Sequence, residues 1–167
     1  MPATITVVQN SGWVAGTFVA GIAKDISNLI SVDDGNETKE DNPLGIPKTG
    51  IVRSFETWIR CRCDVAPATS CTNFKAWYLT GLPEEGFTLK VNSSVINTYE
   101  QPSELESLQG TRADFTDSVD AGSAINLAGV LINIGDYTSW LVFQLEITKE
   151  ASPGISSLEY MIEWDES

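Results

Sequence analysis

The stretch Phe55-Glu56-Thr57-Trp58-Ile59-Arg60-Cys61-Arg62-Cys63-Asp64-Val65 decides the fold class, because its side chains alternate in polarity with a period of two. Odd positions are apolar apart from Thr57, and even positions are charged apart from Trp58. Successive side chains of an extended strand point to opposite faces, so this alternation is typical of a half-buried β-strand. We therefore predict a strand over residues 55–65 whose odd-numbered side chains face a core.

The segments that follow repeat this pattern between turns. A breaker run at 66–70 leads to an aromatic-rich stretch at 73–80, and a Gly-Leu-Pro turn within 81–86 leads to an alternating stretch at 87–91. Runs of this length, bounded by Gly, Pro and Ser, are typical of strands. We predict that these three consecutive strands form an antiparallel meander.

Further strands are predicted in the C-terminal half. An apolar run at 125–133 and a turn at 134–137 precede residues 140–147, in which one face carries Leu141, Phe143, Leu145 and Ile147. The closing run at 158–164 places Glu159, Met161 and Glu163 on one side and, on the other, Leu158, Tyr160, Ile162 and Trp164. The first pattern predicts a core strand, and the second predicts a final strand.

The first 50 residues give mixed signals. Apolar residues from Val14 to Ile30 recur every four positions, as on a helix face, whereas Gly12, Gly16 and Gly21 and the β-branched residues favour strands. We favour strands here, and we expect an exposed loop over residues 33–48, which contains Asp-Asp-Gly-Asn and Asn-Pro. Whether residues 1–50 form an arm that orders on assembly or two ordinary strands stays open at this point.

The strands together predict the fold class. With 167 residues the chain has the size of one domain, and we predict a single β-sandwich domain over residues 1–167. Many short strands between Gly, Pro, Asn and Asp turns, without alternating helices, favour an all-β antiparallel sandwich that is jelly-roll-like. An immunoglobulin-like sandwich is the main alternative, but its Cys…Trp…Cys framework is absent from the sequence.

Composition excludes several classes of function. The chain has 10 basic and 23 acidic residues, a formal net charge of −13, which disfavours binding to nucleic acid or to anionic membranes. It contains no histidine, so Ser-His-Asp and Cys-His catalytic arrangements and the commonest zinc ligand are excluded. The first residues lack the basic and apolar regions of a secretory signal, and we expect a protein that stays in a cytoplasm or leaves it by lysis.

Cysteines and acidic loop residues are the candidates for a metal site. Cys61, Cys63 and Cys71 lack the spacing of a zinc site, and we expect reduced, buried thiols, although a Cys63–Cys71 disulfide is geometrically conceivable. Weak calcium candidates, which offer hard oxygen ligands, are Asp33, Asp34, Asn36 and Glu37. Their spacing does not match an EF-hand, so a plain acidic loop is favoured, and we predict no cofactor.

A glycoside hydrolase on such a sandwich would need two carboxylates on facing strands. The acidic side chains on the predicted strands alternate outward, opposite apolar faces: Glu56, Asp64, Glu146, Glu159 and Glu163. A solvated sheet face explains this pattern better than catalysis does. We predict that the protein is not an enzyme.

Aromatic and basic residues supply the candidates for an interface. Trp58, Arg60 and Arg62 project from one face of the strand at 55–65, and such residues are enriched at protein interfaces and able to stack on sugars. Together with Trp77 they are our interface candidates. The alternative is a tryptophan covered by a neighbouring loop, with the two arginines solvated or paired to carboxylates, and both interpretations stay open.

Several segments follow one another in a distinctive order of strands and turns. They are Asn73-Phe74-Lys75-Ala76-Trp77-Tyr78, the Gly-Leu-Pro turn, Phe87-Thr88-Leu89-Lys90-Val91, Tyr99-Glu100-Gln101-Pro102, Ser139-Trp140-Leu141-Val142-Phe143-Gln144-Leu145 and Tyr160-Met161-Ile162-Glu163-Trp164-Asp165-Glu166. Across residues 50–167 this order resembles small β-sandwich structural proteins encoded among the virion genes of tailed phages and related viruses.

The resemblance implies a non-catalytic role in a virion. Such a protein decorates or cements a capsid as a symmetric homo-oligomer, for which we expect a trimer, and it binds the major capsid protein or other virion proteins. A tail or fibre component is an alternative within the same class. The second hypothesis is a carbohydrate-binding module in which a sugar would stack on Trp58, Trp77 or Trp140.

Overall fold

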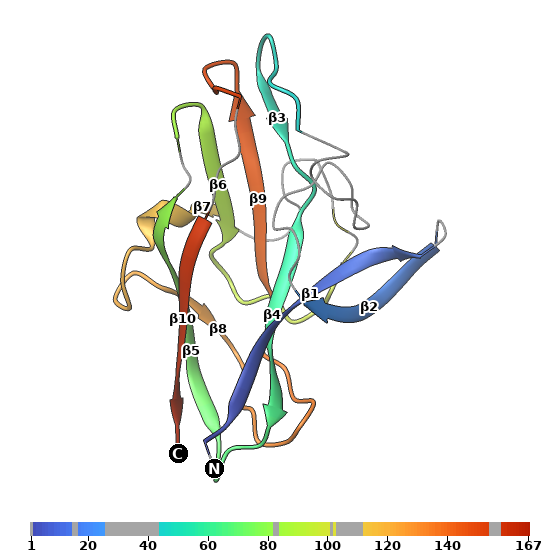
Figure 1. The fold of residues 1–167 in the computed structure, drawn as a ribbon, viewed down its shortest axis with the longest axis vertical. Coiled ribbons are helices and arrows are strands. Elements are labelled where there is room, and N and C mark those ends of the chain that lie inside the picture. Colours follow the sequence, from blue (N-terminus) through green and yellow to red (C-terminus); the bar gives the residue numbers. More distant parts are fainter. Residues whose placement is uncertain are drawn as a thin grey trace.

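The computed structural model describes residues 2–14, 17–25, 44–81, 84–100, 102, 112–153 and 158–167 (Figure 1). Within these ranges the chain consists mainly of β-strands, and its helical part is one short 3₁₀ turn, η1 (Phe115–Asp117). Two antiparallel sheets pack against each other around a shared core. The predicted all-β sandwich is therefore confirmed.

The larger sheet has the strand order β2 (Thr17–Asp25), β1 (Thr4–Val14), β4 (Thr57–Val65), β9 (Leu141–Thr148), β6 (Phe87–Asn92) and β7 (Arg112–Asp114), and β3 (Ile51–Arg53) also pairs with β9. The smaller sheet has the order β10 (Leu158–Glu166), β5 (Cys71–Gly81) and β8 (Ile125–Leu127). Figure 1 shows the start of β1 and the end of β10 at the same end of the sandwich, where the Ala3 amide donates to Glu166 Oε1 at 2.8 Å.

The predicted meander of three consecutive strands is wrong. β4 pairs with β1 and β9, β5 pairs with β10 and β8, and β6 pairs with β9 and β7, so the chain changes sheet after β4 and again after β5. Polarity alternation shows which face of a strand is buried but not which sheet contains it, because both sheets turn an apolar face to one core. The repeated crossing between sheets agrees with the jelly-roll-like prediction.

The core forms where the sequence predicts it. It contains Ile59, Cys61 and Cys63 of β4 and the inward face of β9, including Phe143. The Phe143 ring lies 4.9 Å from the Phe115 ring and 6.1 Å from the Tyr160 ring, centroid to centroid, so it joins both sheets. The apolar side of β10 packs against the same core and is partly buried, as expected of the closing strand.

All three cysteines are free and buried, as predicted, and the conceivable Cys63–Cys71 disulfide is not formed. Burial raises the pKa of the Cys61 thiol to about 12, although a hydrogen bond with Thr138 acts in the opposite direction. Burial also raises the pKa of Cys63 and of Cys71. The three thiols are therefore protonated, weakly nucleophilic parts of the core at neutral pH.

The strands expected near the N-terminus are also present. β1 and β2 form an antiparallel hairpin, in which Asn10 pairs in register with Ala23 and Trp13 with Phe18, and Figure 1 shows this hairpin extending away from the body of the sandwich. β1 joins the larger sheet by pairing with β4 from Thr4 to Asn10. Residues 26–43, with most of the predicted 33–48 loop, lie outside the described residues.

The position of Phe143 gives a test of the core. Replacing Phe143 with Ala removes a fully buried ring that contacts both sheets, so the free energy of unfolding should fall by about 3–5 kcal/mol. Urea denaturation of both proteins measures this loss. The control is Val119→Ala at an exposed position, which should change stability by no more than about 0.5 kcal/mol. Equal losses for the two variants would contradict this description of the core.

Candidate interaction surfaces

The outer face of the larger sheet carries a second, smaller core. Trp58 is 0% exposed and packs edge-on against Tyr99 and Trp140, whose ring centroids lie 5.2 and 5.9 Å away. Ile96 and Val142 complete the cluster, and the Trp140 amide donates to Ile96 O at 2.8 Å, which ties the segment after β6 over the sheet. Of the two interpretations of Trp58, the structure therefore shows a tryptophan covered by a neighbouring loop.

The two arginines on the same strand face also contact their own chain. The Arg60 guanidinium lies 3.7 Å from the ring centroid of Tyr137 and 4.1 Å from that of Trp140, a cation–π arrangement. Burial lowers the pKa of Arg60. Arg62 donates to Asp64 Oδ1 at 2.6 Å. Trp58, Arg60 and Arg62 therefore do not form the exposed set that their shared strand face suggested.

Trp77 differs from the other candidates because it lies on the outer face of the smaller sheet. It is half-buried, it pairs in register with Met161 of β10, and Met161 and the nearby Leu79 are exposed. We call these three residues the Trp77 face. Next to it, Lys75 pairs in register with Glu163 and forms a charged boundary. Of the three tryptophans considered for sugar stacking, Trp58 and Trp140 are buried and Trp77 is partly accessible.

Two of the strand carboxylates that were predicted to lie on a solvated face, Glu146 and Glu56, are in a different environment. Glu146 accepts a hydrogen bond from Arg53 at 2.8 Å and lies 4.0 Å from the Lys90 ammonium, which also pairs with Asp114. Glu56 is 5% exposed, so the prediction of a solvated position is wrong for this residue. The preceding buried Ser54 and the following buried Thr57 and Trp58 show the reason, since both faces of the sheet are covered here.

Neither a metal cluster nor a membrane helix emerges from the described ranges. No group of three or more Cys, Asp or Glu side chains there is arranged to hold a metal ion. The calcium candidates Asp33, Asp34, Asn36 and Glu37 lie outside those ranges. Among the same residues, no helix is long and apolar enough to cross a membrane.

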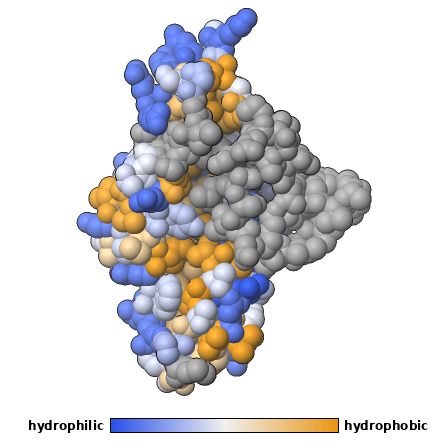
Figure 2. All heavy atoms as spheres, viewed as in Figure 1, coloured by the Kyte–Doolittle hydropathy of each residue, from blue (hydrophilic) through white to orange (hydrophobic). Residues whose placement is uncertain are grey.

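A mostly apolar loop between β8 and β9 lies at one end of the sandwich, and we call residues 128–136 the end loop. Val130, Ile132 and Ile134 are 57%, 50% and 70% exposed, whereas Leu131 between them is buried. Figure 2 shows apolar surface broken into patches by hydrophilic residues, and one patch lies at the lower end, over the loop that joins β8 to β9. Exposed β-branched side chains in an acidic protein identify the end loop as a candidate for binding.

The end loop is held by backbone hydrogen bonds to both sheets. Leu131 exchanges two such bonds with Cys71 of β5, each 2.9 Å long. Gly135 N donates to Cys63 O of β4 at 2.8 Å, and Cys63 N donates to Asp136 O at 3.0 Å. The loop therefore connects the smaller sheet to the larger one, and its exposed side chains are presented from a fixed backbone.

Asp136 fixes the tip of the loop. Its Oδ2 accepts hydrogen bonds from the amides of Ile132 at 2.8 Å and Asn133 at 2.7 Å. These two backbone donors lower the pKa of Asp136, because they stabilise the ionised carboxylate. Gly135 supports the turn with a φ of 90°, a conformation that a residue with a Cβ rarely adopts.

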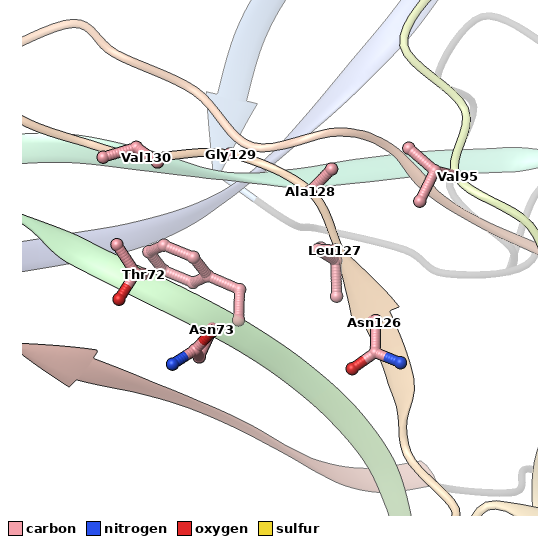
Figure 3. Close-up of a pocket in the computed structure, with 9 residues that line it drawn as sticks. Thr72, Asn73, Val95, Asn126, Leu127, Ala128, Gly129 and Val130 are labelled. Atoms are coloured by element: carbon pink, nitrogen blue, oxygen red, sulfur yellow. The ribbon is translucent and has the colours of Figure 1, made fainter.

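A shallow groove adjoins the end loop (Figure 3). Val130 forms part of it together with Val95, which is exposed on the segment after β6, and Figure 3 shows these two valines toward opposite ends of the groove. The remaining lining residues are Thr72, Asn73, Phe74, Asn126, Leu127, Ala128 and Gly129. None of the lining side chains is ionisable. We call the end loop and this groove together the end surface.

Sequence reasoning did not identify the end surface. Within the apolar run at 125–133, only the first three residues form a strand, because β8 ends at Leu127. The available signal was glycine, because Gly129 and Gly135 interrupt the apolar residues and both have positive φ angles. Ile132 and Ile134 are exposed because hydrogen bonds to both sheets hold the loop backbone in place. The polarity pattern of the sequence does not predict such bonds between distant segments.

No protein-family model, curated protein or solved structure matches the chain. The interpretation of the two apolar surfaces therefore depends on their residues and geometry.

A comparison of two tryptophans tests which of them belongs to the core. Trp58→Ala should lower the free energy of unfolding by about 3–5 kcal/mol, because the indole is fully buried. Trp77→Ala, at a half-buried position on the sheet surface, should cost less. Chemical denaturation of the two variants measures both values. A smaller loss for Trp58→Ala than for Trp77→Ala would contradict their placement.

The role of Asp136 is testable by hydrogen exchange. Asp136→Ala removes the acceptor of two loop amides, so Ile132 and Asn133 should exchange faster. In the wild type this support should be present above the ordinary carboxyl pKa of 3.8 and lost as the pH falls through the lowered pKa. The matched control is Asp120→Ala, which should accelerate exchange at Gly122 and Ser123 but leave the end loop unchanged. Unaltered exchange at residues 132 and 133 in Asp136→Ala would contradict the assignment.

Proposed function

We propose that this protein is a non-catalytic viral structural protein that decorates or cements a capsid, through self-association and through binding to the major capsid lattice. One observation carries the proposal: two separate apolar surfaces, the end surface and the Trp77 face, are exposed on ordered parts of an acidic β-sandwich. A protein that only associates with itself needs one such surface, whereas a cementing protein needs contacts with its own copies and with the lattice.

The chemistry of both surfaces suits protein contacts. The cores of protein interfaces are depleted of charged residues and enriched in aromatic residues and Met, and the Trp77 face supplies Trp77 and Met161. The end surface supplies β-branched side chains on a loop fixed by hydrogen bonds. Because the backbone of this loop is already fixed, association loses less conformational entropy than it would with a flexible loop.

Binding over a lattice allows weak contacts to give stable attachment. Once one copy of an oligomer is bound, its neighbours bind at a high effective concentration, so overall affinity exceeds that of a single contact. Surfaces as small as the Trp77 face are therefore sufficient if each oligomer makes several contacts. The resemblance to virion structural proteins and the ion-paired state of Glu146 and Asp64, which leaves them poorly suited to acid–base catalysis, agree with a non-catalytic role.

The proposal predicts that the protein is a component of virus particles. An antiserum against the purified protein should detect it in the particle fractions of a density gradient from the source culture. Particles stripped of the protein should then bind purified wild-type protein again. Met161→Asp should abolish most of this binding by placing a carboxylate on the Trp77 face, whereas Ile51→Asp, at an exposed apolar position on β3 of the larger sheet, should bind as the wild type does. Absence of the protein from particles would overturn the proposal.

A further inference from the structure

We propose that the end surface joins this protein to a second copy of itself, with the exposed tip of one end loop, around Ile134, inserted into the groove of the other copy between Val95 and Val130. This inference rests on the self-association in the proposed function and identifies the surface responsible for it. It leaves the Trp77 face available for a different partner. The second copy is the one occupant to which the inference commits.

Charge is the first argument for a second copy. Each copy carries a formal charge of −13, so two copies repel each other, and this repulsion is lowest where the contact contains few carboxylates. Residues 121–135 contain no ionisable side chain, and the groove lining contains none either. Asp136 of the end loop and Asp165, which contacts the groove residue Asn73, both accept hydrogen bonds from their own chain: Asp136 Oδ2 from the Ile132 and Asn133 amides, and Asp165 Oδ2 from Asn73 at 2.6 Å.

Shape is the second argument. The end loop is a convex element with Ile132 and Ile134 exposed, and the groove is a concave one next to it, with Val130 belonging to both. A surface that carries a projection and a recess side by side is able to pair with a copy of itself, because each recess receives the projection of the other copy. The contact then contains two equivalent sets of apolar side chains in a two-fold pair, or one set per neighbour in a closed ring.

A comparison with the long outer edge of the smaller sheet supports this choice. β10 is an outer strand of that sheet, and it carries four acidic residues, Glu159, Glu163, Asp165 and Glu166. Two copies joined at this edge would bring like charges together, and its pairing with β5 contains two register shifts that make the strand irregular. The end surface, by contrast, contains a single carboxylate, that of Asp136, and its groove lining contains no ionisable side chain.

The main experiment measures the mass of the intact protein in solution by size-exclusion chromatography with light scattering, over a range of concentrations. The monomer mass is 18.1 kDa, and the wild type should form a dimer or a closed ring at the higher concentrations. Ile134→Asp and Val95→Lys should each weaken association at least about tenfold, because each places a charge in an apolar contact. The control Val119→Asp, at a position that is 57% exposed, should associate as the wild type does.

A mixing experiment tests the specific arrangement. In a mixture of Ile134→Asp and Val95→Lys copies, the aspartate of one copy would enter a groove that carries the lysine of the other. The remaining contact in a two-fold pair would have wild-type residues on both sides. Mixed oligomers should therefore form at concentrations at which each variant alone is monomeric. Circular dichroism and thermal melting confirm that both variants are folded.

The possible outcomes separate the two proposals. A wild type that is monomeric at every concentration, or variants that associate as the wild type does, would overturn the inference, and detection of the protein in particles would still support the proposed function. Association through the end surface by a protein that is absent from particles would support the inference and overturn the function. Loss of association in both variants without recovery on mixing would overturn the insertion of the loop tip into the groove.

Discussion

The structure depends on satisfying the backbone of β9, a strand that is buried on both faces. Its inward side chains belong to the main core, while Val142 and Gln144 on the other face are also buried. Every amide of such a strand needs a partner within the protein. Where the strand ladder does not supply one, side chains do: Asn92 Oδ1 accepts from Val142 N at 2.7 Å, and Ser54 Oγ accepts from Leu145 N at 3.0 Å. Both of these polar residues are buried, so either one, if replaced by an apolar residue, would leave a buried amide unsatisfied.

The same requirement explains why the end loop is ordered. β8 belongs to the smaller sheet and β9 to the larger, so the connection between them must cross the end of the sandwich. It does so by pairing Leu131 with Cys71 and Gly135 with Cys63, which satisfies backbone groups of both sheets at that end. These bonds fix the backbone and the inward Leu131, but they place no demand on the exposed side chains. The apolar character of those side chains is therefore not required by the backbone bonds that order the loop.

Much of the fold could be predicted from alternating polarity, and the failures share one cause. The pattern in β4 and β9 correctly identified the core face, because every second side chain of a strand points to the same face and burial of that face makes those residues apolar. The pairing of strands and the cover over Trp58 depend on contacts between distant segments, which no local pattern contains. A signal for the second core was nevertheless available: Trp58, Trp140 and Val142 are apolar residues at positions where a solvated face would be polar.

The candidate surfaces were harder to predict for a related reason. Exposure of an apolar residue is a property of the folded chain, and Trp58 and Trp77 illustrate it: both are tryptophans on predicted strands, yet one is fully buried and the other is partly accessible. The difference arises from the segment after β6, which lies over Trp58, whereas Trp77 faces outward beside Met161. Residue type alone therefore did not distinguish the buried tryptophan from the accessible one.

The charge of the protein gives the end surface a physical property that distinguishes it from an ion-paired interface. Repulsion between two copies of net charge −13 opposes association at long range, and it weakens as salt shortens the screening length, which is about 8 Å at physiological ionic strength. In the proposed contact, the attraction between Ile134 and the groove valines is apolar and is not weakened by salt in this way. Salt reduces the opposing repulsion and leaves this attraction, so the proposed association should strengthen as ionic strength rises. An interface built on ion pairs would respond in the opposite direction, because the same screening would weaken its favourable term.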